Sequence, residues 1–103
     1  MSRIALAVVV LITSSGAAGY SVRGNGTATC AAWTQASSDT RTASEQWVLG
    51  FLSGIGFMAL GELDPLRGLE AKAVAAWVDD YCRAHPEATL ESAAGVFIRE
   101  HPR

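Results

Sequence analysis

The chain has few charged residues, and almost none of its positive ones are lysines. Of its 103 residues only 17% are Asp, Glu, Lys or Arg, and Lys72 is the single lysine. Neither a basic stripe nor an acidic tail is present. Because proteins bind nucleic acid and anionic membrane surfaces through clustered positive charge, we expect neither as a partner.

Residues able to carry catalysis or hold a metal are also scarce. His85 and His101 each precede a proline at a predicted helix end, where a histidine usually lies in solvent beside the helix C-terminus. Asp79 and Asp80 are adjacent, so on a helix their side chains point about 100° apart and do not form a carboxylate pair. Residues 82–85 (Cys-Arg-Ala-His) lack a second ligand pair, and no nucleophile elbow or phosphate-binding glycine pattern occurs. We predict no catalytic, metal or cofactor site, and a protein that is not an enzyme.

Residues 1–19 have the order of a bacterial secretory signal peptide. Arg3 supplies a positive charge, residues 4–12 form an unbroken apolar run, and small residues follow. This run is too short to span a bilayer, so we expect export to the periplasm without a stable membrane anchor. Cleavage fits after Ala18 or Gly19. A buried N-terminal helix and an uncleaved anchor are the alternatives.

Two cysteines, Cys30 and Cys82, remain in the exported chain. In the oxidising periplasm they are expected to form a disulfide, and only one pairing within the chain exists. Closing a loop of this length contributes ~4 kcal/mol in the chain-entropy model, which is comparable with the whole stability of a small domain. Two free thiols, or a bridge between two chains, are the alternatives.

The rest of the chain predicts one small all-α domain. Residues 20–28 are rich in glycine and threonine, lack periodicity, and indicate a flexible arm. Residues 29–100 carry helical patterns separated by short breaks, without a strand pattern or an internal repeat. The predicted fold is a small orthogonal four-helix bundle (three longer helices and a short one) with one disulfide.

Caps and prolines delimit the four predicted helices. The first starts at Thr29 and ends at the polar residues 37–40. The third spans residues 70–84, since Pro86 prevents its continuation, and the fourth begins at a cap on Thr89.

The second predicted helix is the most distinctive. Residues 42–45 (Thr-Ala-Ser-Glu) have the form of a capping box, in which the threonine hydroxyl and the glutamate satisfy free amides of the first turn. From Trp47 to Leu60 the chain contains no charge, although about 14 residues are too few to cross a membrane. We expect this helix to be the centre of the bundle, surrounded by the others.

In so small a domain not every face of such an apolar helix can be covered. Part of it, or the loop that follows, is therefore a candidate surface for a client protein or a second copy of the chain. The candidate residues are Trp47, Phe51, Ile55, Phe57, Met58, Leu63 and Leu66. For each of them alone, a place in the core is the competing interpretation.

The segments around the cysteines resemble a known family. Residues 29–33 (Thr-Cys-Ala-Ala-Trp) are similar to the Thr-Cys-x-x-aromatic start of the HdeA/HdeB periplasmic acid-stress chaperones. Residues 78–86, followed by Thr-Leu at 89–90, are similar to that family's Tyr-Cys-basic-x-x-Pro segment. The resemblance implies that Trp33 and Tyr81 pack on the family's disulfide.

This resemblance also implies a function. Members of the family are inactive dimers at neutral pH, and acid opens them to expose apolar surface that holds unfolding periplasmic proteins. Protonating ten carboxylates and two imidazoles would move the exported chain from about −3 to roughly +9, a self-repulsion able to loosen a domain. We accordingly expect a periplasmic binding protein, a homodimer activated by acid. The chain departs from the family in lacking its lysine-rich ends and in having a middle richer in Gly and Ala.

A second resemblance implies a different role. Residues 50–54 (Gly-Phe-Leu-Ser-Gly), followed by Trp-Val-x-x-Tyr-Cys at 77–82, are similar to immunity proteins of the Tai type, which neutralise toxins delivered by type VI secretion. Such a protein would match a toxin cleft and would be indifferent to acid. An envelope interaction module without an acid response is a third interpretation.

Overall fold

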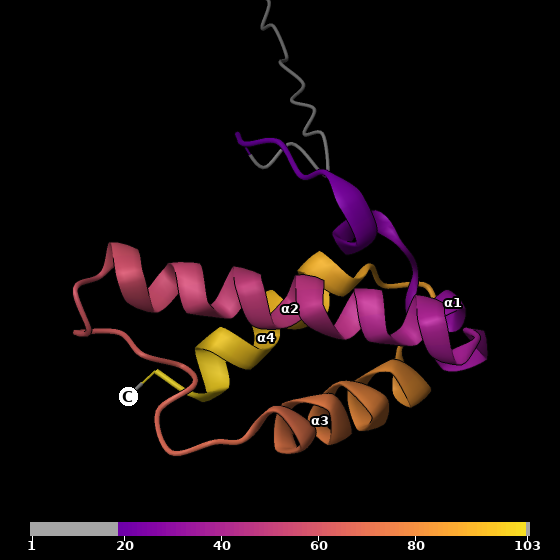
Figure 1. Cartoon of the computed structure of the whole chain (residues 1–103). Coiled ribbons are helices and arrows are strands. Elements are labelled where there is room, and N and C mark those ends of the chain that lie inside the picture. Colours follow the sequence, from indigo (N-terminus) through magenta and orange to yellow (C-terminus); the bar gives the residue numbers. More distant parts are fainter. Residues whose placement is uncertain (1–18, 103) are drawn as a thin grey trace, which may run out of the picture.

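Four α-helices and one short 3-10 helix make up residues 19–102, which are the part of the chain that the computed structural model describes (Figure 1). No strand occurs in this part, so the predicted all-α fold class is confirmed. The predicted signal peptide, apart from its last residue, lies outside the described residues. The elements are η1 (Gly24–Thr27), α1 (Cys30–Gln35), α2 (Ser38–Met58), α3 (Ala71–Ala84) and α4 (Leu90–Glu100).

Two threonine caps confirm the predicted starts of the first and last helices. Thr29 Oγ1 accepts a hydrogen bond from the amide of Ala32, and Thr89 Oγ1 accepts one from the amide of Ser92, both at 3.1 Å. Each cap satisfies an amide that lacks a partner within its helix. Between them, α3 ends ahead of Pro86, as the sequence predicts.

The predicted start of the second helix is wrong, because α2 begins before the capping box. Its N-cap is Ser37, whose Oγ accepts a hydrogen bond from the amide of Thr40. Arg41 and Glu45 then form an ion pair one turn apart at 3.1 Å, which supports the helix where a break was expected. The polar residues 37–40 therefore cap and open α2, and residues 42–45 lie within it.

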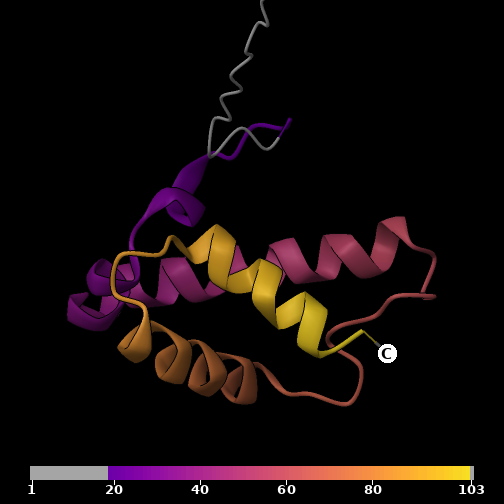
Figure 2. The ribbon, with the colours of Figure 1, turned by 180° about the vertical axis from the view of Figure 1, so that it is seen from behind.

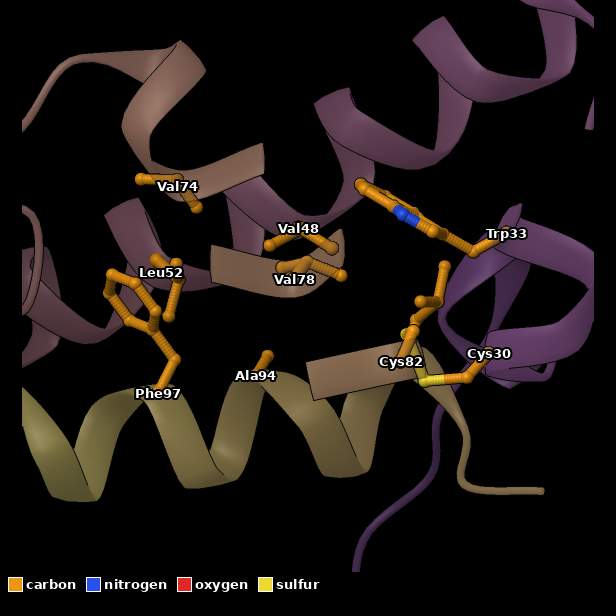
Figure 3. Packing of buried hydrophobic residues seen from close by; sticks show 10 residues of the cluster. Cys30, Trp33, Val48, Leu52, Val74, Val78, Cys82, Ala94 and Phe97 are labelled. Carbon is orange, nitrogen blue, oxygen red and sulfur yellow. A yellow bond between two sulfur atoms is a disulfide. The ribbon is translucent and has the colours of Figure 1, made fainter. Parts of the chain in front are cut away.

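Side chains from all four helices meet in one core (Figure 3). Seen from behind, α4 crosses in front of α2, and α3 lies below them (Figure 2). Helix α4 contacts both α2 and α3, so its buried face closes the space between them. Burying each large aliphatic or aromatic side chain contributes about 1.5–3 kcal/mol. The largest buried side chains are Trp33, Val48, Leu52, Val74, Val78, Leu90 and Phe97.

The expectation that α2 is surrounded by the other helices is also wrong. Only Ser44, Val48 and Leu52 of this 21-residue helix are buried. Its opposite face carries Gly50 and Gly54, and a Cβ at either would meet nothing within 4 Å. The three other helical segments are too short to enclose a helix of this length, so one side of α2 faces solvent.

The predicted disulfide is confirmed, and it joins α1 to the end of α3. Cys30 and Cys82 are both buried, and Trp33 lies beside the bond (Figure 3). Backbone hydrogen bonds reinforce the junction, including one of 2.7 Å from the amide of Cys30 to the carbonyl of Ala88. Tyr81 stacks on the neighbouring rings of α3 and its C-cap.

Residues 20–28, which were expected to form a flexible arm, instead pack on the bundle. This segment, which we term the strap, contains η1 and lies against α2 and α4 (Figure 1). The indole Nε1–H of Trp47 donates to the carbonyl of Arg23 at 2.9 Å. The composition of residues 20–28 predicted a flexible segment, because the residue that its glycines contact, Trp47, lies far from them in the sequence.

Candidate functional site

The outer end of α2 exposes three large apolar side chains. Phe57, Met58 and Leu60, here termed the tip, have 78%, 77% and 88% of their surface exposed. They lie within a charge-free stretch, so no salt bridge or charged side chain of this segment screens them. Contiguous exposed apolar side chains on a small protein mark an interaction surface.

The end of the helix holds Leu60 in an unusual conformation. Leu60 has φ 54°, in the left-handed region, and Gly61 follows with φ 81°. The amide of Gly61 donates to the carbonyl of Gly56 at 2.9 Å, which closes the helix end. For a residue with a Cβ this conformation costs about 1–2 kcal/mol. Leu60 therefore adds exposed apolar surface to the tip, while its left-handed conformation lowers the stability of the folded chain.

The structure divides the predicted apolar surface into two groups. Phe57 and Met58 are exposed at the tip, whereas the other five candidates are half-buried. Of these five, three pack against the core: Trp47, Phe51 and Leu66. Leu60 was missed, although the signal was present, since it continues the charge-free run and precedes a glycine.

A cluster of polar contacts connects α1, α2 and α3. Asp79 Oδ1 accepts a hydrogen bond of 2.8 Å from the indole of Trp33 and one of 2.6 Å from Arg41 Nη2. The Arg41 guanidinium lies over the Trp33 ring, 4.1 Å from its centroid, in cation–π geometry. We term this three-residue cluster the Asp79 lock.

Within residues 19–102, the lock contains the only salt bridge between different helices. The other pairs are local, since Glu45, Asp64 and Asp80 each pair with an arginine three or four residues away. Of the three lock residues, Trp33 lines a shallow cleft between α2 and α3, whose wall includes Val48 and Val78. The Arg41–Asp79 ion pair joins the same two helices beside the Trp33 ring.

The two histidines share one local structure, at the ends of α3 and α4. His85 and His101 each stack on the aromatic residue four positions earlier, Tyr81 or Phe97, with ring centroids about 4 Å apart. Each Nδ1–H donates to the carbonyl of that same aromatic residue. Both helices end with aromatic-x-Arg-x-His-Pro, so the expectation of no internal repeat is wrong. This repeat is a helix-ending device that satisfies free carbonyls.

The described residues contain neither a cluster of metal ligands nor a membrane-spanning helix. No three His, Cys, Asp or Glu side chains of residues 19–102 lie close enough together to hold a metal ion. None of the helices in this range has both the length and the apolarity to cross a membrane.

Searches among protein families, curated proteins and solved structures found no significant match to this chain.

Proposed function

We propose that this chain is a non-enzymatic binding protein of the bacterial periplasm, which holds unfolding client proteins by their apolar segments. The observation that carries the proposal is the exposure of Phe57, Met58 and Leu60 together at one charge-free helix end. Because the hydrophobic effect is non-directional, such a surface accepts varied apolar sequences. The disulfide supports residence in an oxidising compartment.

Acid is the proposed activator, and it acts through the net charge of the whole chain. In acid the exported chain moves from about −3 to roughly +9. This self-repulsion loosens α2 from α3, which the Asp79 lock joins at neutral pH, and adds core side chains to the exposed surface. The Cys30–Cys82 bond keeps α1 and α3 joined in the opened form. At neutral pH we expect a second copy of the chain to cover the tip.

Client holding at two pH values tests the proposal. The chain, exported with its own leader and purified from the periplasm, should bind a hydrophobic dye and suppress aggregation of an unfolding protein at about pH 2–3 but not at neutral pH. Replacing Phe57 and Met58 by serine should abolish most of the suppression. A matched control replaces Thr42 and Ala43, exposed on the same helix, by serine and should retain it.

The same measurement separates the competing interpretations. A toxin-binding immunity protein or an envelope module would bind dye equally at both pH values. Equal dye binding at both pH values, or unchanged client holding by the Phe57 and Met58 variant, would contradict the proposal.

A further inference from the structure

The strap covers the beginning of the apolar face of α2. Gly26 is buried against the indole of Trp47, so closely that a Cβ there would lie 2.2 Å from Trp47 Cζ2. Asn25 Nδ2 donates to Ser44 Oγ at 3.2 Å, one turn before the indole. Together with the bond from the indole to the carbonyl of Arg23, these contacts place the strap backbone directly on the ring. Only glycine at position 26 allows this approach.

The covered indole and the exposed tip belong to one stripe of α2. Trp47, Phe51, Ile55 and Met58 recur at intervals of three and four residues, which places them along one side of the helix. The rings of Trp47 and Phe51 stack, with centroids 5.3 Å apart. The strap lies on the first member of the stripe, whereas the last member, Met58, is exposed. Without the strap, an uncovered apolar strip would run from Trp47 to the tip.

The middle of the strap is held by polar contacts and not by apolar side chains of its own. Residues 23–27 contain no large apolar side chain, so closure buries little apolar surface of this part, whereas Ala28 at the inner end packs against the core and accepts a hydrogen bond of 2.9 Å from the amide of Leu90. Two of these five residues are glycines, which lose the most conformational freedom when they become ordered. The outer end is held by the Tyr20 hydroxyl, which donates to Glu91 on α4 at an exposed position. The inner end is anchored, since Cys30 follows it and is bonded to α3.

We infer that the strap is a displaceable cover, an autoinhibitory contact that hinges near Cys30 and closes the Trp47 half of the client-binding face. The segment that displaces it has the chemistry of the strap: a turn with a carbonyl for the indole N–H and, three residues later, a small residue against the ring. Apolar side chains next to that residue would continue along the stripe to the tip. The inference rests on the proposed function for the nature of the client, but the covering itself is independent of it.

Substituting Gly26→Ala tests the cover, because the added methyl group prevents closure over the indole. At neutral pH the variant should bind hydrophobic dye that the wild type does not bind, because displacement of the strap exposes the indole of Trp47. Quenching of tryptophan fluorescence by a soluble quencher should also increase. The matched control is Gly95→Ala in α4, where the nearest atom to the new Cβ lies 3.9 Å away.

A second variant distinguishes uncovering from general loosening. In Gly26→Ala combined with Trp47→Ala the indole is gone, both as the group that the new methyl would strike and as the apolar surface that it would uncover, so the rise in dye binding should disappear. An equal rise in both variants, or no rise in Gly26→Ala, would overturn the inference. If Gly26→Ala binds more dye but the wild type holds no client in acid, the proposed function is wrong and the cover stands. If the wild type holds clients and Gly26→Ala behaves like it, the cover is wrong and the function stands.

Discussion

Substitution of Asp79 measures how much the lock contributes to stability. Asp79→Asn keeps an oxygen for the Trp33 indole but removes the charge that faces Arg41. The side chains of Asp79 and Arg41 are 35% and 27% exposed, so solvent screens the pair and its loss should cost about 1 kcal/mol. Asp79→Ala also leaves the indole N–H of buried Trp33 without an acceptor, which raises the expected total to about 2–3 kcal/mol.

Urea unfolding with the disulfide intact is the appropriate assay. At neutral pH the unfolding midpoints should fall in the order wild type, Asp79→Asn, Asp79→Ala, with unchanged slopes. Asp80→Asn is the matched control, because the partner of Asp80 is the nearby, exposed Arg83 and such pairs contribute little.

Equal unfolding midpoints of wild type and Asp79→Asn at neutral pH would refute the assignment of the Arg41–Asp79 pair as a stabilising connection between α2 and α3.

Three further predictions address other features of the fold. Replacing Cys30 and Cys82 together by serine should lower the free energy of unfolding by ~4 kcal/mol, measured by thermal or urea unfolding, and a loss below about 1 kcal/mol would contradict the role of the disulfide. Leu60→Gly should raise stability by about 0.5 kcal/mol, because relief of the left-handed strain exceeds the added freedom of the unfolded chain, and should reduce dye binding; a destabilised variant would argue against strain. Three effects raise the pKa of the Tyr20 hydroxyl. The hydrogen bond to Glu91 is the largest, and desolvation and the negative charge of Glu91 add to it. The stabilisation from this contact is therefore present below the ordinary tyrosine pKa and is lost as pH rises through the higher folded value. Ultraviolet titration should detect a late-ionising tyrosine that is absent from Tyr20→Phe.

Local features were predictable from the sequence because the residues that create them are neighbours in the chain. The threonine caps at 29 and 89 each satisfy an amide three residues away. Pro86 acts on the residue next to it, and the disulfide followed from there being only two cysteines in a chain that was expected to be exported. The helical class follows from spacings of three and four residues, which are also local.

The features that decide the candidate site join residues far apart, and only the folded chain brings them together. Arg41 and Asp79 are separated by 38 residues, and Arg23 and Trp47 by 24, so no local pattern connects either pair. The start of α2 was misjudged because Ser37 provides an N-cap before the plausible capping box, so that the box lies inside the helix. The exposure of the tip likewise depends on the lengths of the other helices, which together cover only one side of α2. Sequence thus determined which segments are helical and apolar, and tertiary packing decided which apolar residues remain open to a partner.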